Sequence, residues 1–193
     1  KSNLGFSSKY IAFSKSELLT PSSSNSSSLN NQNLKNSIFF GDNNDFEAVD
    51  YLIVTSEEML SQAERLAEIN RNVNDLNVKV VDLNTIYNEF NSSNPDVSAI
   101  RNFVKYVYDN SEGNLKYLCL FGDASYDYKD RIANNSNIVP SWHSLSSFSL
   151  SSSFISDDFF GMMDFNEGSM SSSDKLDIAV GRILADTPQR AKD

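Results

Sequence analysis

The sequence is poor in the two residue types that most often mark a hydrolytic site. It contains a single cysteine, Cys119, and a single histidine, His143, in 193 residues. One cysteine cannot form an intrachain disulfide and says little about the cellular compartment. No stretch approaches the roughly 18 apolar residues of a membrane-spanning helix, and no signal peptide is visible. The chain begins without methionine, at Lys1, and stops near an expected helix start, so we interpret it as a segment of a longer protein.

Basic residues are also scarce. Sixteen Lys and Arg face 26 Asp and Glu, which gives a formal net charge of −10 and an isoelectric point near 4.5. Nucleic acids and anionic membranes bind clustered Lys and Arg, so we expect no nucleic-acid partner. The acidic balance is compatible with small cations, including calcium.

Residues 1–48 have little regular patterning. Short strands are expected at 9–13 and 37–40, separated by the Ser- and Asn-rich residues 21–31. That composition buries too little apolar surface to offset the entropy of ordering the chain, which predicts a mobile loop. We therefore expect residues 1–48 to form an extended N-terminal arm.

From residue 49 onward, short apolar runs alternate with stretches in which apolar residues recur at helical spacing. The runs expected as strands are 51–54, 77–82, 118–121, 159–163 and 176–181. The expected helices are 56–72, with a capping box from Thr55 and Glu58, 85–90, one starting at Asn94-Pro95, and one starting at Asp186-Thr187-Pro188. Strands that are apolar throughout are covered on both faces. The alternation therefore predicts a three-layer α/β domain over residues 49–193 with a mainly parallel sheet.

A serine-rich stretch interrupts this rhythm at residues 131–156. Nine of the sixteen residues from 141 to 156 are serine, interleaved with Trp142, Phe148 and other apolar side chains. The aromatic residues distinguish this stretch from a flexible linker. We expect a long ordered loop, and such loops in compact domains are often functional.

We first consider whether the sequence contains a serine or cysteine nucleophile. Gly122-Asp123-Ala124-Ser125 resembles the nucleophile block of some serine esterases, but the hydroxyl comes one residue late. The sequence has no Gly-x-Ser-x-Gly elbow and no aspartate placed to orient His143. Cys119 lies within an apolar run, where a buried structural thiol is expected rather than an exposed thiolate. A serine esterase that uses Ser125 remains an alternative.

Acidic residues gather between positions 157 and 177. The cluster contains Asp157, Asp158, Asp164, Asn166, Glu167, Asp174 and Asp177. Asp164-x-Asn166-x-Gly168 has the alternating oxygen ligands and the glycine of calcium loops, without the full EF-hand pattern. Acid-rich loops are usually solvated, so the pattern alone leaves both a calcium site and an ordinary surface loop open.

Six segments in order resemble one peptidase family. They are YLIVTSEEMLSQAERLAEINR, VKVVDLNTIYNEFN, AIRNFVKYVYD, LKYLCLFGDASYDYKD, SDDFFGMMD and LDIAVGRILADTP. Together they resemble the first part of the gingipain-type (C25) cysteine peptidase domain. The likeness is strongest to the members that serve as cell-surface sortases of the type IX secretion system.

The resemblance implies a caspase-like, Rossmann-like subdomain that carries no catalytic residue. The catalytic Cys and the His of a Gly-His-Gly motif would lie in a following subdomain, and neither Cys119 nor His143 matches them. The full protein would then be a cysteine endopeptidase at the outer membrane and cell surface. Its expected partners are its own catalytic subdomain, secretion-system components of the outer membrane, and cargo proteins with C-terminal sorting domains. A structural or binding module without a protease is the alternative.

The resemblance also implies structural calcium. The family's ligands fall on Asp123, after a central strand, and on Asp177, before the Val-Gly-Arg strand. Asp164 and Asn166 are the matching loop residues. The insertion at 168–173 departs from the family pattern at this point. These four residues are the predicted metal ligands.

Overall fold

The computed structural model describes residues 12–18, 32–41, 43–146 and 148–192. The chain forms two compact units, Lys1–Asn31 and Gln32–Asp193. The described part of the first unit contains one short 3-10 helix, η1 (Lys15–Glu17). The loop expected at 21–31 and most of the strand expected at 9–13 lie outside the described residues.

A parallel four-stranded sheet forms the centre of the second unit. Its strands are β1 (Tyr51–Thr55), β2 (Val78–Asp82), β3 (Tyr117–Phe121) and β6 (Ala179–Ile183), in the order β2-β1-β3-β6. The register places the last residue of β1 level with the last residues of β2 and β3. The carboxyl ends of these strands therefore meet at one edge of the sheet.

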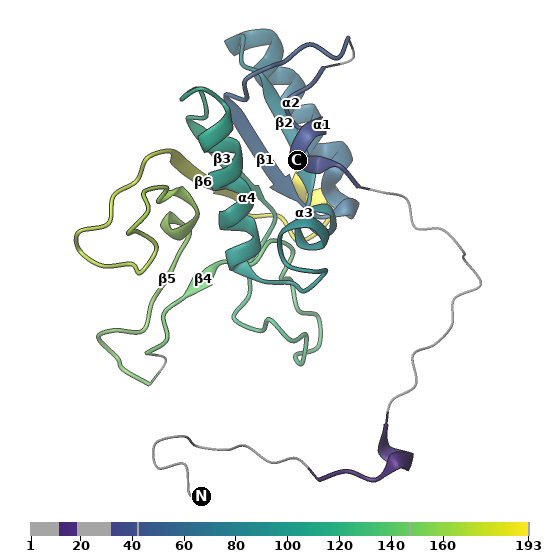
Figure 1. Cartoon of the computed structure of the whole chain (residues 1–193), viewed down its shortest axis with the longest axis vertical. Helices are drawn as coiled ribbons and strands as arrows, with labels where there is room; N and C mark the ends of the chain where they lie inside the picture. The colour runs from purple at the N-terminus through teal and green to yellow at the C-terminus, as the bar shows by residue number, and fades with distance from the viewer. Residues whose placement is uncertain (1–11, 19–31, 42, 147, 193) are drawn as a thin grey trace, which may run out of the picture. The chain divides into compact units, whose positions relative to one another are not determined.

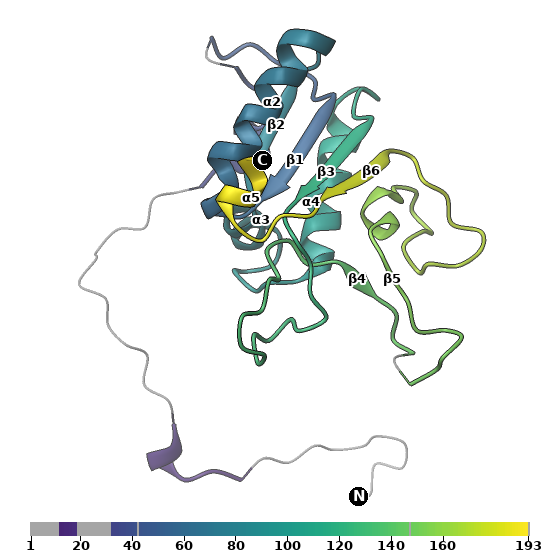
Figure 2. The same cartoon turned by 180° about the vertical axis from the view of Figure 1, so that it is seen from behind.

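Helices cover both faces of the sheet. On one face lie α3 (Leu83–Phe90) and α4 (Val97–Asn110), with α1 (Leu34–Ser37) packed against α3. The other face carries α2 (Leu60–Asn74) and α5 (Pro188–Lys192) (Figures 1 and 2). This arrangement confirms the predicted three-layer α/β fold.

The central strands β1 and β3 are almost entirely apolar because each has two buried faces. Leu52 and Val54 pack with α4, while Ile53 between them packs with α2 on the opposite face. Phe103 of α4 is fully buried in the larger cluster, and a side chain of this kind contributes about 2–3 kcal/mol by leaving water. The compact unit begins before the boundary expected at residue 49, because Leu34 also belongs to this core.

Two helix starts differ from the sequence prediction. Thr55 is the last residue of β1 and donates its hydroxyl to the carbonyl oxygen of Phe121 at 2.6 Å, so it does not cap a helix. The residue that caps α4 is Asp96, whose carboxylate accepts the Ser98 N–H at 2.6 Å. Pro95 precedes this cap instead of occupying the first turn. In both places a tertiary or local hydrogen bond outweighs the sequence pattern.

Two expected strands are wrong. Residues 37–40 contain the end of α1 and a single β-bridge from Phe40 to Phe46. The segment expected as a strand at 159–163 is mostly the 3-10 helix η3 (Asp158–Gly161), which packs on α4 and β6. A short apolar run does not by itself distinguish a strand from a buried helical turn.

The serine-rich stretch contains a small antiparallel pair, β4 (Trp142–His143) with β5 (Ile155–Ser156). Within the described ranges, no helix is both long enough and apolar enough to cross a membrane.

Candidate functional site

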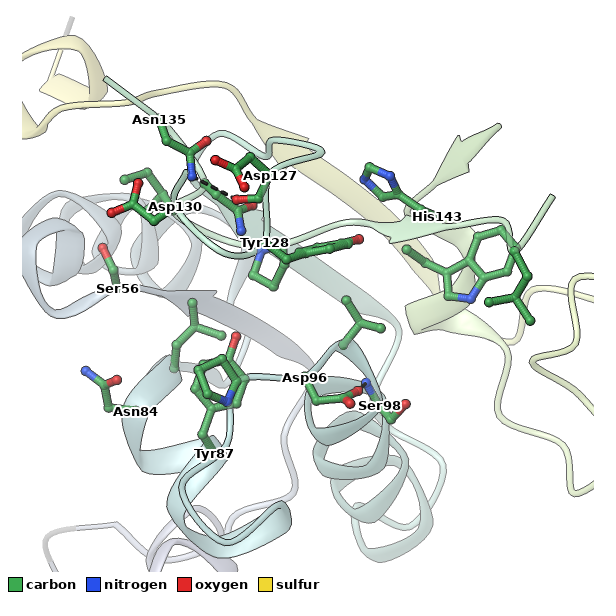
Figure 3. A pocket seen from close by; sticks show the side chains of 18 residues that line it. Ser56, Asn84, Tyr87, Asp96, Ser98, Asp127, Tyr128, Asp130, Asn135 and His143 are labelled. Atoms are coloured by element: carbon green, nitrogen blue, oxygen red, sulfur yellow. Dashed lines mark hydrogen bonds between the residues drawn. The ribbon is translucent and has the colours of Figure 1, made fainter. Parts of the chain in front are cut away.

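A pocket of about 780 Å³ lies at the carboxyl edge of the sheet (Figure 3). Its walls come from the ends of β1 and β2, the start of α4, and the loop between β3 and β4. The chain runs from β1 to its neighbour β2 on one side and then crosses over to β3, the neighbour of β1 on the other side. In open α/β sheets, ligands bind in the crevice at this kind of switch point.

Two helix N-termini form one wall of the pocket. Asp82 caps α3 by accepting the Thr85 N–H at 3.1 Å, and Asp96 caps α4. Tyr87 of α3 also lines this wall; it is 7% exposed, and its hydroxyl has no hydrogen-bond partner within the described ranges. Burial raises the pKa of Tyr87 above its ordinary value, and the charges of Asp96 and Asp82 raise it further. Its hydroxyl therefore stays protonated and points into the pocket.

The loop after β3 forms the opposite wall and is ordered around Asp127. The carboxylate of Asp127 accepts N–H groups from Ile132 at 2.7 Å, from Arg131 and from Lys129. Burial raises the pKa of Asp127, but these N–H donors and the Arg131 charge outweigh it, so the net pKa is below the usual range. Asn135 donates to the backbone oxygen of Asp127 at 2.9 Å (Figure 3). The carboxylate therefore organises the loop.

This loop places Tyr128 across the pocket. Its hydroxyl donates to the backbone oxygen of Ser141, and burial raises its pKa to about 12. Its ring lies 4.9 Å from the ring of His143, centre to centre. The Nε2 atom of His143 is 3.3 Å from the Ser141 hydroxyl, and burial lowers the pKa of this imidazole. His143 is therefore uncharged at neutral pH.

Arg182 of β6 fixes the loops beside the pocket. Its side chain is 9% exposed and forms a two-pronged ion pair with Asp157, at 2.8 Å and 2.7 Å. It also donates to the carbonyl oxygens of Gly122 at 2.8 Å and Val139 at 2.6 Å. One guanidinium thus joins β3, the loop after it, and the start of η3.

Cys119 and Ser125, the two candidate nucleophiles, are both held in structural contacts and not in a catalytic arrangement. Cys119 is 4% exposed within β3, and burial raises the pKa of its thiol to about 11. The Ser125 hydroxyl accepts the Asp127 N–H at 3.1 Å. His143 is bonded to Ser141 instead of Ser125, so the geometry gives the esterase alternative no support.

The sequence model of Peptidase family C25 matches residues 44–193. This chain belongs to peptidase family C25. The crystal structure of dimeric latent PorU from Porphyromonas gingivalis matches it with a TM-score of 0.59 and 28% identity. The match covers 74% of this chain and 14% of the PorU chain, so the segment corresponds to a small part of that protein. A search of the curated proteins gives no match.

The structure separates two of the four calcium ligands predicted for this C25 segment. Tyr117 pairs with Ala179 and Phe121 with Ile183, so Asp177 comes before the paired segment and Asp123 after it, at opposite ends. At about 3.3 Å per residue the paired segment alone is roughly 13 Å long. A single ion cannot bind both, which corrects the expectation of one shared site.

The other two predicted ligands lie nearer to Asp177. Its carboxylate accepts the Met163 N–H at 2.6 Å, and Asp164 is the next residue along the chain. Asn166 is exposed. In the described part of the chain, no group of three or more His, Cys, Asp or Glu is arranged to hold a metal ion. Calcium binding by this segment stays a prediction.

Sequence reasoning about this C25 chain overlooked the residues that shape the pocket, notably Tyr87, Asp96 and Arg182. Asp96 had a visible signal, because an aspartate before an apolar helical stretch is a common cap. An arginine inside the apolar strand Ala-Val-Gly-Arg-Ile indicates a buried partner, since charged side chains are rarely buried unpaired. Tyr87 had no comparable signal, because its place in a helical stripe is typical of core residues.

Proposed function

We propose that this chain is the non-catalytic part of a C25 cysteine endopeptidase and that it positions a catalytic subdomain elsewhere in the full protein. The buried thiol of Cys119 carries this proposal. A catalytic cysteine acts as a thiolate in a partly open, electropositive setting, whereas Cys119 lies in a central strand with a raised pKa. The Cys–His dyad that the family requires is then supplied by other residues of the full protein.

More specifically, we propose that the full protein is a sortase related to PorU. The 28% identity to PorU supports it. In this proposal the full protein is at the cell surface, works with outer-membrane components of the type IX secretion system, and cleaves C-terminal sorting domains from cargo.

An electrophilic probe tests the assignment of the nucleophile. The native full-length protein is labelled with iodoacetamide, and the labelled peptide is located by mass spectrometry. The label is expected outside residues 1–193, and Cys119→Ala is expected to retain full peptidase activity. Labelling of native Cys119 together with loss of activity in Cys119→Ala would overturn the proposal. A full-length protein with no labelled cysteine and no peptidase activity would favour the structural or binding module.

Structural calcium is a separate part of the proposal, with Asp164 and Asp177 as its ligands in this chain. A hundredfold excess of calcium over Kd stabilises the folded state by about 2.7 kcal/mol, so melting should shift upward relative to EDTA. Asp177→Asn should remove the shift while its side-chain oxygen still accepts the Met163 N–H. Asp123→Asn, at the other end of the sheet, should leave it unchanged. Equal melting temperatures in calcium and in EDTA would contradict calcium binding.

A further inference from the structure

We propose that the pocket at the carboxyl edge of the sheet binds an organic cation: an ammonium or guanidinium group carried on an apolar stem. This goes beyond the proposed function, because the pocket contains no residue assigned to peptide cleavage. Three features carry the inference, namely the helix N-termini, the unpaired acids and the aromatic walls.

The helix N-termini at this edge are already occupied by the chain's own carboxylates. Free helix N-termini bind anions such as phosphate through unpaired N–H groups and the positive end of the helix dipole. Here Asp82 caps α3 and Asp96 caps α4. Glu57 and Glu58 lie in η2 (Glu57–Met59), which leads into α2. A phosphate or carboxylate ligand would meet these charges and be repelled.

All the charged residues that line the pocket are acidic. It contains Asp96, Asp127 and Asp130, and none of its lining residues is Lys or Arg. Asp127 uses its oxygens on backbone N–H groups of its own loop. One oxygen of Asp96 accepts the Ser98 N–H, while its second oxygen and the carboxylate of Asp130 have no hydrogen-bond donor among the described residues. Two carboxylates on facing walls therefore keep acceptor capacity for a ligand (Figure 3).

The remaining walls suit the stem and the charge of such a ligand. Tyr87, Tyr128 and Trp142 line the pocket, and the faces of aromatic rings attract cations within about 6 Å of the ring centre. The Tyr87 side chain is 7% exposed, and its hydroxyl, which has no hydrogen-bond partner among the described residues, offers an acceptor for an N–H of the ligand. Leu83, Val97 and Ile138 supply apolar surface. A side chain this deeply buried whose phenol finds no protein partner is a second, independent indication of a ligand, since the polar groups of buried side chains are normally hydrogen-bonded.

Trp142 is the only tryptophan in the chain, so its fluorescence reports on the pocket directly. The 193-residue chain is titrated with n-butylammonium and n-butylguanidinium, and with n-butanol and butyrate as neutral and anionic matches. We expect a saturable change with both cations that weakens as salt is added, and none with butanol or butyrate. Calorimetric titration of the full-length protein with the same four compounds is the second measurement. Absence of saturable cation binding in both measurements, or butanol binding as tightly as butylammonium, would overturn the proposal.

Asp96→Asn isolates the charge from the helix cap, because asparagine caps helices as well as aspartate does. We expect this variant to weaken butylammonium binding at least about fivefold, the size of a partly exposed ion pair. Asp75→Asn is the matched control. It removes an equal charge from the exposed C-cap of α2, at the other end of the sheet, in a left-handed conformation that asparagine tolerates. Unchanged affinity in Asp96→Asn, or equal losses in both variants, would overturn the assignment.

The same assay distinguishes two possible sources of the cation, a lysine side chain of a protein and a small free amine. Nα-acetyl-lysine amide and the tripeptide Gly-Lys-Gly with acetylated and amidated ends carry the same ammonium group as butylammonium and no other charge. Tighter binding of the tripeptide would identify a protein side chain as the ligand, and tighter binding of butylammonium would identify a small free amine. Binding of either supports the cation site, whereas binding of none contradicts it.

Discussion

Arg182 shows how one side chain fixes the loops beside the pocket. Its side chain is 9% exposed, and its donors reach Asp157, Gly122 and Val139 on three different segments. A buried ion pair costs desolvation energy on both partners, so removing one partner leaves the other as an uncompensated charge. The side chain therefore matters for the local architecture more than its formal charge suggests.

We predict that Arg182→Met lowers the free energy of unfolding by about 3 kcal/mol, the usual range for breaking a buried pair. Arg190→Met is the control, because Arg190 forms an ion pair with Asp186 but is 71% exposed, and such pairs contribute less than about 1 kcal/mol. Denaturant unfolding of both variants measures the difference. Similar losses in the two variants would contradict the structural role assigned to Arg182.

The hydrogen bonds of Asp127 predict how the stability of the fold depends on pH. Its pKa in the folded state is lowered, with backbone N–H donors outweighing burial. A carboxyl of this kind contributes stability above its unfolded pKa, about 3.9, and loses that contribution as pH falls through its lower folded pKa. Asp127→Asn should therefore be less stable than the wild type at pH 6, and the difference should shrink below about pH 4. Unfolding curves from pH 2 to pH 7 test this, and a difference independent of pH would contradict it.

At the scale of elements, α4 holds the acidic loop that follows η3. Arg101 donates to the carbonyl oxygens of Met162 at 2.6 Å and Glu167 at 3.0 Å, and Lys105 donates to that of Met163 at 2.6 Å. Gly168 closes the loop against Arg101 with a φ of +94°. A Cβ atom there would lie 2.7 Å from the guanidinium carbon.

Gly168→Ala should therefore destabilise the chain by about 2 kcal/mol, since the Arg101 guanidinium must move off its carbonyl acceptors in addition to the strain of a positive φ. Gly113→Ala supplies the matched control. Gly113 also has a positive φ, +79°, but a Cβ there would meet open space, so only the strain of about 1 kcal/mol is expected. Thermal melting of both variants compares the two effects. Equal shifts would mean that the contact with Arg101 contributes nothing.

At the scale of the whole molecule, the sheet is covered unevenly. Among the residues that the structure describes, no helix lies over β3 and β6 on the α2 side (Figure 2), and a pocket of about 730 Å³ runs along this face. A Cβ atom added at Gly181 would meet open space on this face, and Tyr117 of β3, which also lines the pocket, is 44% exposed. We propose this face as the contact for the catalytic subdomain, because β6 is also an edge strand with one paired neighbour.

Gly181→Glu in the full-length protein should then lower peptidase activity, because it places a charge in the proposed contact. Phe148→Glu provides the comparison, since Phe148 is fully exposed in the loop between β4 and β5 and lines neither pocket. Both variants of the isolated segment should melt like the wild type, because neither position is part of the core and a Cβ at Gly181 meets open space. Full activity of Gly181→Glu in the full-length protein would exclude this face as the contact.

The sequence by itself determined the four strands of the parallel sheet, the layers and the family. Tyr51–Thr55 and Tyr117–Phe121 are recognisable because burial on both faces makes nearly every position apolar, a pattern written in consecutive residues. Only the tertiary structure decided which residues lie together in one site. Strand register sets Asp123 and Asp177 at opposite ends of the sheet, and folding of the loop after β3 brings Tyr128 opposite Tyr87. Register and loop packing depend on contacts between residues far apart in the chain, which local patterns do not encode.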